Sequence, residues 1–187
     1  MSVSTSDYKY QLVTRKIGLW LFILSESMIF IALLFTRFVM QGVNRPEELN
    51  QELGLGITLL LLISSFTANR AEVLISRGDQ RGFLRNLGIT IILGLAFLLI
   101  VVLIEWPEAR HFAPISTGYG TLFYVITGMH AFHVLTGLIV LGIAFVQGKQ
   151  GRYSAEDYWG AQGGIIYWHF VDVVWVFVYP ILYLMGP

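Results

Sequence analysis

Cysteine is absent from this chain of 187 residues. Its absence excludes thiolate metal sites, attachment of haem through cysteine, and disulfide bonds. Charged residues are also scarce: they make up 13% of the chain, whereas a soluble globular domain carries about 25%. The chain therefore has too few charges for a surface that faces water on all sides.

An excess of either charge is also missing. The 12 basic residues balance the 12 acidic ones, so the formal net charge is zero. No basic patch of the kind that binds nucleic acid is expected from this balance. The first residues, 1–11, are polar and lead into a long apolar stretch. Because a signal peptide has a short apolar region and a small-residue cleavage site, we expect the first helix to be retained.

Apolar residues make up 56% of the chain and are gathered in blocks. Five blocks have the length of about 20 residues that a helix needs to cross a bilayer. They cover residues 16–40, 54–76, 83–104, 119–147 and 163–185. Barrel strands alternate in polarity, but the blocks contain unbroken apolar runs. The sequence predicts an all-α, integral membrane bundle of five transmembrane helices, with one domain at 16–187 after a short cytoplasmic arm at 1–15.

The loop charges predict an orientation. Lysine and arginine in short loops mark the cytoplasmic side. Alternate polar segments carry most of them: Lys9, Arg15, Lys16, Arg77, Arg81, Arg85, Lys149 and Arg152. The opposite segments place two arginines beside acidic residues: Arg45 and Arg110 with Glu47, Glu48, Glu52 and Glu108. We expect the N-terminus inside and the C-terminus outside.

Helix-breaking residues separate the expected spans. Asn44-Arg45-Pro46 follows the first, Arg77-Gly78-Asp79 predicts a tight turn, and Trp106-Pro107 is expected to end the third. Several glycines lie inside spans, where small residues let helices approach closely. These are Gly88, Gly94, Gly137 and Gly142.

Glu26 is the first ionisable group expected deep in the membrane. It lies about ten residues into the first span, roughly 15 Å deep. Such a carboxyl group is costly unless it is neutral or has partners. Two interpretations stay open: a neutral group hydrogen-bonded to a neighbouring helix, or a site that handles protons or binds a lipid headgroup.

Two further charged positions lie nearer the ends of spans. Arg70 is about 9 Å from the inner end of the second span. Snorkelling to the interface or contact with lipid is the favoured interpretation, and pairing with Glu26 is the alternative. Glu105, beside Trp106 at the outer end of the third span, is interpreted as an interfacial anchor.

Histidines form the remaining intramembrane pattern. His130 and His133 share one helix face at a spacing of i, i+3, and His169 and Asp172 repeat that spacing on the last helix. An aspartate near a histidine can fix its tautomer. The depths of the histidines on the two helices differ by roughly 12 Å, which argues against haem ligation by two histidines. Interhelical hydrogen bonding, lipid contact and a proton path stay open.

Four motifs together resemble subunit III of the haem-copper oxidases, which include cytochrome c and quinol oxidases. They are Phe22-Ile23-Leu24-Ser25-Glu26, Leu103-Ile104-Glu105-Trp106, Gly128-Met129-His130-Ala131-Phe132-His133-Val134, and Tyr167-Trp168-His169-Phe170-Val171-Asp172-Val173-Val174-Trp175. They occur in the family's order from residue 16 to the end, in what resembles its five-helix form. The family often has adjacent histidines where this chain has Arg70-Ala71-Glu72-Val73, so their lipid contacts are not transferred.

The resemblance implies a subunit without haem or copper, which are held by the partner catalytic subunit that reduces oxygen and pumps protons. Subunits I and II and membrane phospholipids are the implied partners, and a larger respiratory supercomplex is a further option. Supporting roles in proton supply, lipid contact or interhelical bonding are expected, without catalytic or metal-binding residues. The candidates are Glu26, Arg70, Glu105, His130, His133, Trp168, His169, Asp172 and Trp175.

Three rival interpretations accompany this one. A subunit-III-like component of a nitric oxide reductase is a variant of it. A free-standing membrane cytochrome would need haem or metal on His130, His133 or His169. A small transporter would use Glu26 and Arg70 along a water path. The lack of cysteine and the compact five-helix form favour a bacterial plasma membrane as the location.

Overall fold

The computed structural model describes residues 5–42 and 49–185 of the chain, and all the regular elements of these residues are helical. The expected break at 44–46 and the charges of Arg45, Glu47 and Glu48 lie outside the described residues. The elements are α1 (Thr5–Gln41), α2 (Gln51–Ser76), α3 (Gln80–Ile100), η1 (Val101–Glu105), α4 (Trp106–Phe112), α5 (Gly118–Lys149), α6 (Trp159–Tyr179) and η2 (Pro180–Leu184).

Five of the described helical segments are long and apolar enough to cross a membrane, which confirms the predicted all-α bundle of five spans. The segments are Tyr10–Met40, Gln51–Ser76, Gln80–His111, Gly118–Lys149 and Trp159–Leu184. The first helix differs from expectation at its start. It begins at Thr5, so most of the arm expected before residue 16 continues the first helix.

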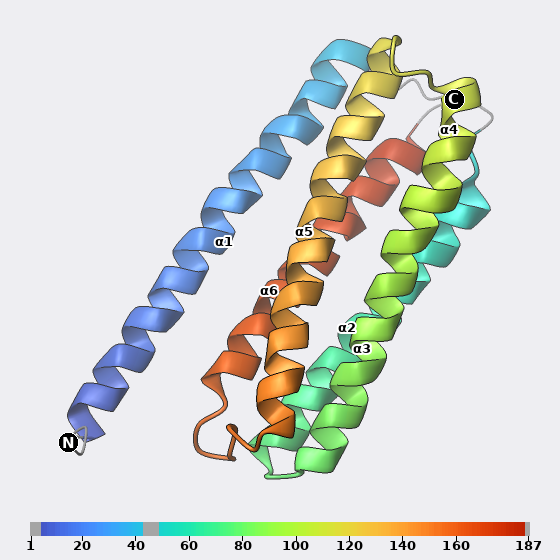
Figure 1. The fold of residues 1–187 in the computed structure, drawn as a ribbon. Helices are drawn as coiled ribbons and strands as arrows, with labels where there is room; N and C mark the ends of the chain where they lie inside the picture. The colour runs from blue at the N-terminus through green and yellow to red at the C-terminus, as the bar shows by residue number, and fades with distance from the viewer. Residues whose placement is uncertain (1–4, 43–48, 186–187) are drawn as a thin grey trace.

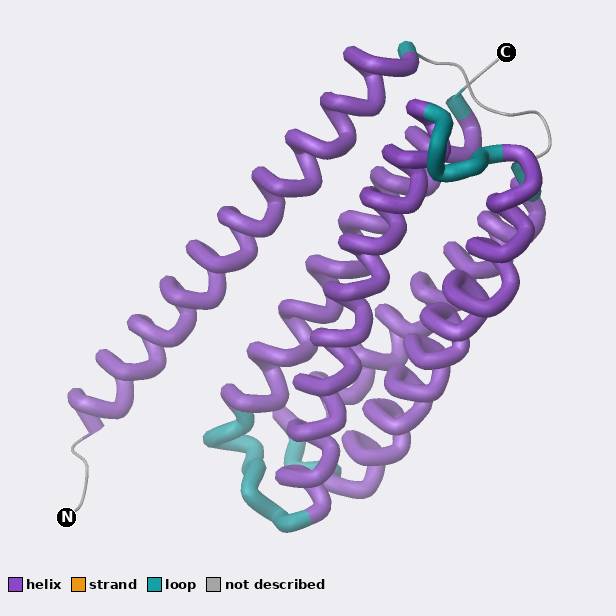
Figure 2. The backbone as a smooth tube through the Cα atoms, turned by 45° about the horizontal axis from the view of Figure 1, so that its top comes forward, coloured by secondary structure: helices purple, strands orange, loops and turns teal. Residues whose placement is uncertain are grey.

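The helices run roughly side by side, and the starts of α1 and α6 lie at the same end of the bundle (Figure 1). The α2–α3 turn and the α5–α6 loop lie at that end too, which we call the N-terminal end. There α1 diverges from the other helices, as both views show (Figure 2). It packs against α5 and α6, whereas α2, α3, α5 and α6 pack closely with one another.

The connections at the N-terminal end follow from glycine and capping residues. Gly78 has a φ of +78° and Gly151 a φ of +69°, values that side chains with a Cβ rarely adopt. Asp79 then caps α3 by accepting a hydrogen bond from the Gly82 N–H at 2.9 Å. The tight turn predicted at residues 77–79 is therefore confirmed.

The prediction that Trp106-Pro107 ends the third helix is wrong. The helix passes through a π-helical turn, η1, and continues as α4 to Phe112. The Trp106 N–H bonds to the Val101 carbonyl, five residues earlier. Pro107 stands where η1 passes into α4, and the change to π-helical geometry there accommodates a residue without an N–H.

Trp168 on α6 lies at the centre of the bundle and is 0% exposed. Two glycines make room for its indole. A Cβ on Gly94 of α3 would lie 2.4 Å from Trp168 Cη2, and a Cβ on Gly137 of α5 would lie 2.8 Å from Trp168 Cε3. Neither distance is compatible with a side chain, so these two glycines are required by the close packing of α3, α5 and α6.

The four intramembrane glycines therefore have different expected sensitivities. Replacing Gly94 by alanine is expected to destabilise the bundle by about 1–3 kcal/mol, because it overpacks the core against Trp168. A Cβ on Gly142 would meet nothing within 4 Å, so Gly142→Ala is the matched control and is expected to be neutral or stabilising. Unfolding in mixed detergent and SDS micelles measures both. Equal stability of the two variants would contradict this packing.

Candidate functional site

Two tryptophans of α6 are fixed by hydrogen bonds to α2. The indole N–H of Trp168 donates to Ser64 Oγ at 3.0 Å, and that of Trp175 donates to Thr58 Oγ1 at 2.9 Å. Both indoles are buried inside the bundle. They therefore face neighbouring helices instead of the membrane, and they set the register between α2 and α6.

Two more pairs extend this register towards the N-terminal end. Ser65 Oγ lies 2.7 Å from His169 Nδ1, and the Gln162 side-chain amide donates to Glu72 Oε1 at 2.8 Å. All four side chains are partly exposed at the α2–α6 seam. His169 thus has Ser65 as its partner.

The clearest ion pair in the described part of the chain joins α1 to α5. His133 Nε2 lies 3.0 Å from Glu26 Oε2, and the two side chains are 5% and 20% exposed. Both residues lie near the middle of their spans, Tyr10–Met40 and Gly118–Lys149. The alternative pairing of Glu26 with Arg70 is not observed. Glu26 therefore joins the divergent helix α1 to the rest of the bundle.

The second nitrogen of His133 defines the chemistry of this pair. His133 Nδ1 lies 2.8 Å from the Met129 carbonyl oxygen, which can only accept, so Nδ1 must carry hydrogen. Nε2 then bonds to Glu26 only if one proton lies between the two groups. It is held either by a neutral Glu26 beside a neutral His133 or by an imidazolium beside a carboxylate. In both forms the pair is neutral overall and can hold a proton at the middle of the membrane.

Asp172 and His130 lie on the other side of α5 and α6, inside the bundle. They are 3% and 1% exposed. Neither carboxyl oxygen of Asp172 and neither ring nitrogen of His130 has a hydrogen-bond partner among the described residues. Asp172 does not bond to His169, so the predicted pairing that would fix the tautomer of that histidine is not formed.

Glu105 differs from the expected interfacial anchor. It is 4% exposed and accepts a hydrogen bond from the Tyr183 hydroxyl, which η2 brings to it. The adjacent Trp106 donates its indole N–H to Thr127 Oγ1 of α5 at 3.2 Å. The π-helical turn η1 aims Glu105 at the bundle interior, which its position near the end of a span did not predict.

Arg70 is exposed on α2. No ion pair involving it is found within the described residues. The side chain can therefore reach the membrane interface at the N-terminal end, as the snorkelling interpretation requires.

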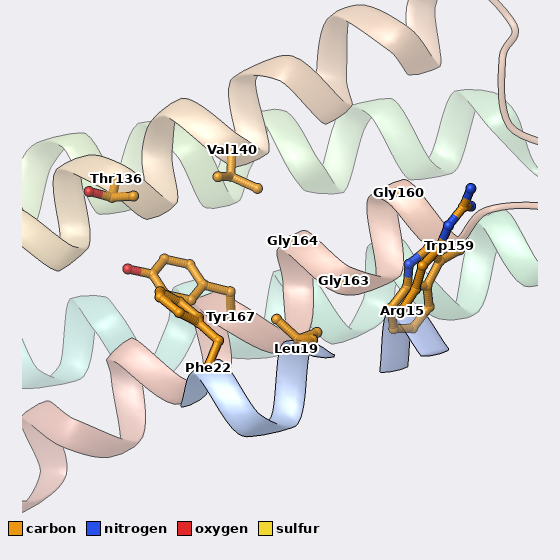
Figure 3. A pocket seen from close by; sticks show the side chains of 10 residues that line it. All are labelled: Arg15, Leu19, Phe22, Thr136, Val140, Trp159, Gly160, Gly163, Gly164 and Tyr167. Carbon is orange, nitrogen blue, oxygen red and sulfur yellow. The ribbon is translucent and has the colours of Figure 1, made fainter. Parts of the chain in front are cut away.

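A groove opens where α1 diverges from α5 and α6. It has a volume of about 510 Å³. Figure 3 shows Arg15 and Trp159 together at one end and Phe22 and Tyr167 at the other. Lys16 Nζ lies 5.7 Å from the centre of the Trp159 ring. The walls of the groove are largely apolar, and its one cationic lining residue, Arg15, lies at one end. The lining residues are Arg15, Leu19, Phe22, Thr136, Val140, Trp159, Gly160, Gly163, Gly164 and Tyr167.

Histidine, aspartate and glutamate side chains do not converge on a metal site. Within residues 5–42 and 49–185, no group of three or more of them could hold a metal ion. The polar groups are arranged in pairs between helices, which suits hydrogen bonding and proton exchange more than metal coordination.

Comparison with known proteins identifies the family. Residues 8–187 match the family model described as cytochrome c oxidase subunit III. The chain belongs to the cytochrome c oxidase subunit III family. The resemblance of the four motifs is thereby confirmed, and the match covers all five spans.

Individual relatives in the family have about a third of their residues in common with this chain. The cytochrome c oxidase subunit 3 of Thermostichus vulcanus is 33% identical over 91% of this chain and 87% of its own length. The quinol oxidase subunit 3 of Bacillus spizizenii is 34% identical over 98% of this chain and 94% of its own length. The cytochrome c oxidase subunit 3 of Podospora anserina is 35% identical over 91% of this chain and 67% of its own length.

Several site residues were not predicted. Ser64, Ser65 and Thr58 bond the tryptophans and His169, but a serine or threonine in a span gives no signal of its partner. The glycine spacing of Gly160, Gly163 and Gly164 was a usable signal for the floor of the groove. Tyr183 could not have been linked to Glu105, because their contact depends on two π-helical turns.

Proposed function

We propose that this chain is the non-redox subunit III of a respiratory haem-copper oxidase, packed against the catalytic subunit in a plasma membrane. The observation that supports this most is the family match over residues 8–187. Relatives named as subunit 3 of both cytochrome c and quinol oxidases fit the proposal for either electron donor. In this proposal the chain holds polar groups at the middle of the membrane beside the catalytic subunit. It thereby supports proton uptake and sustained turnover of the oxidase.

Haem and copper belong to the partner subunits in this proposal. The described residues offer paired histidines and carboxyl groups and no three-ligand cluster, so this part of the chain does not fit a metal centre. Purification of the tagged chain in mild detergent is expected to recover a large multi-helix catalytic subunit and its haem absorption bands. The bands should vanish when the chain is separated from that partner. Haem that stays with the isolated chain would contradict the proposal and identify a cytochrome.

The groove beside α1 supports a second part of the proposal, binding of an anionic phospholipid. The glycines of α6 offer a smooth floor for an acyl chain, while Arg15 at one end offers a cation for a phosphate group. Lys16 packs on Trp159 beside it, and such rings and cations settle at membrane interfaces. The arrangement matches a lipid whose headgroup lies at the N-terminal end.

Removing the positive charge of Arg15 should weaken the binding of this lipid. Arg15→Gln is expected to lower the amount of anionic phospholipid retained by the purified complex about fivefold, the effect of roughly 1 kcal/mol per basic residue near a lipid surface. Arg85→Gln is the matched control, because Arg85 is exposed on α3 at the same end of the bundle. Lipid extraction with mass spectrometry measures both. Equal retention in the two variants would contradict lipid binding at Arg15.

The orientation follows from the charges at the N-terminal end. The described loops and helix ends there carry Arg77, Arg81, Arg85, Lys149 and Arg152. Because basic residues in short loops favour the cytoplasmic side, we assign the N-terminal end to the cytoplasm. The lipid groove then opens towards the inner leaflet.

A further inference from the structure

Asp172 on α6 is a buried acid without a partner for either of its oxygens. The residue is 3% exposed, and neither carboxyl oxygen makes a hydrogen bond within the described part of the chain. No ion pair of those residues involves it either. An ionised carboxyl group in such surroundings is costly, because nothing replaces the water that it loses. Asp172 is therefore expected to be neutral, with a proton that has to come from outside the bundle.

Ser65 on α2 carries the hydroxyl group next to this acid. Its side chain lies close to Asp172, and its Oγ is 2.7 Å from His169 Nδ1. His169 and Asp172 have the i, i+3 spacing that places two side chains on one face of a helix. The hydroxyl of Ser65 therefore lies between a buried carboxyl group and an imidazole ring that do not bond to each other directly.

His169 connects this hydroxyl to the outside of the bundle. The residue is partly exposed, and its Nε2, which bonds to no described residue, keeps some exposure. The charged neighbour of His169 is Glu72 of α2, which accepts a hydrogen bond from the Gln162 side-chain amide at 2.8 Å. By residue position, Glu72 and Gln162 lie about 10 Å nearer the N-terminal end. Polar groups therefore follow the α2–α6 seam from that end towards Asp172.

We propose that Asp172 is a proton-binding site that exchanges its proton through Ser65 and His169. The Ser65 hydroxyl has one hydrogen, so it donates to one neighbour and accepts from the other. When Asp172 is ionised, the hydroxyl donates to the carboxylate and accepts from the Nδ1–H of His169. When Asp172 is neutral, the hydroxyl is free to donate to His169 Nδ1. The observed contact of Ser65 with His169 fits this second form.

One proton crosses the relay in two coupled transfers. His169 in its imidazolium form passes the Nδ1 hydrogen to Ser65 Oγ, while the original hydroxyl hydrogen passes to the Asp172 carboxylate. His169 is then neutral with hydrogen on Nε2, Ser65 again has one hydrogen, and Asp172 is neutral. Release of the proton is the reverse of these steps. The hydroxyl is required in both directions, because the histidine and the acid have no direct contact.

Infrared spectroscopy tests the relay on the full-length chain in the complex with which it purifies. No turnover is needed, so the result does not depend on the function proposed for that complex. A protonated carboxyl group has its own carbonyl stretching band, and the band of Asp172 is the one that Asp172→Asn removes. In heavy water this band shifts as deuterium replaces hydrogen, and the rate of the shift measures exchange. Absence of the band, or a band that does not exchange, would overturn the proposal.

Variants of Ser65 test the route of exchange. Ser65→Ala is expected to slow the exchange at Asp172 roughly a hundredfold, the lower end of what a positioned proton-transfer group contributes. Ser65→Thr keeps a hydroxyl group and should retain fast exchange. Ser64→Ala is the matched control, because it removes the adjacent hydroxyl, which bonds to Trp168 instead. Equal exchange rates in Ser65→Ala and Ser64→Ala would overturn the proposal.

A variant of His169 tests the other end of the relay. His169→Gln retains an amide that can hold the Ser65 hydroxyl but cannot pass a proton, so it should slow the exchange as Ser65→Ala does. His111→Gln is its control, because His111 is exposed on α4. Exchange in His169→Gln as fast as in this control would overturn the proposal. If Ser65→Ala does not assemble, this comparison decides the question.

Discussion

Replacing Trp168 by alanine is expected to destabilise the bundle by about 3–5 kcal/mol, the cost of deleting a large buried aromatic side chain. The indole fills the space between Gly94 and Gly137 and is 0% exposed. The substitution also leaves Ser64 without the indole N–H that it accepts. Gly94 and Gly137 line the pocket and have no side chains of their own that could fill the cavity.

The measurement is reversible unfolding in mixed SDS and detergent micelles, followed by circular dichroism. Trp20→Ala is the matched control, because Trp20 is 59% exposed on α1 and its loss should change the stability little. The stability of Trp168→Phe should lie between those of Trp168→Ala and Trp20→Ala. A Trp168→Ala variant as stable as Trp20→Ala would show that the close packing of α3, α5 and α6 around this ring does not hold the bundle together.

The second large effect is expected at the mid-membrane pair. His133→Leu should destabilise the bundle by about 3 kcal/mol, the lower end of the range for breaking a buried pair, since Glu26 keeps some exposure. The variant removes the Nε2 contact with Glu26 Oε2 at 3.0 Å. It leaves a carboxyl group near the middle of the span with no histidine partner, so the docking of α1 should weaken most.

A double variant distinguishes loss of the pair from loss of packing. Replacing Glu26 and His133 by leucine together removes the unpaired group and should be less destabilising than His133→Leu alone. His111→Leu is the control for the residue type, because His111 is exposed on α4. Unfolding in the same mixed micelles is measured for these three variants and for Glu26→Leu alone. Additive effects of the single leucine variants would contradict an interaction between the two side chains.

Much of the fold could be predicted from sequence because the length and composition of one apolar segment are enough to predict a membrane span. Each apolar block contains the length and composition of its own helix, and Gly78 with Asp79 encodes a turn and a cap within a few residues. The continuation through Pro107 was missed because it depends on the change to π-helical geometry in η1. Nothing in Glu105-Trp106-Pro107 alone distinguishes that change from a helix end.

The candidate site was predicted as a set of residues but not as a set of contacts. Intramembrane position alone singled out Glu26, His133 and Asp172. Their partners depend on how helices far apart in the sequence are rotated against one another. The rotation of each helix about its axis brings Glu26 against His133 and Ser65 against His169. It also leaves Asp172 inside the bundle. These pairings depend on how the helices pack around Trp168 and Trp175, and no short sequence pattern predicts that packing.

The position of α1 has a consequence for biosynthesis. Its packing partners, α5 and α6, leave the ribosome after α2 and α3. His133 follows Glu26 by 107 residues, so at about 5–20 residues per second the carboxyl group waits for roughly 5–20 s before its partner exists. During that interval the helix has neither of its packing partners. Its docking is therefore a late event of assembly, set by the order of translation as well as by the energy of contact.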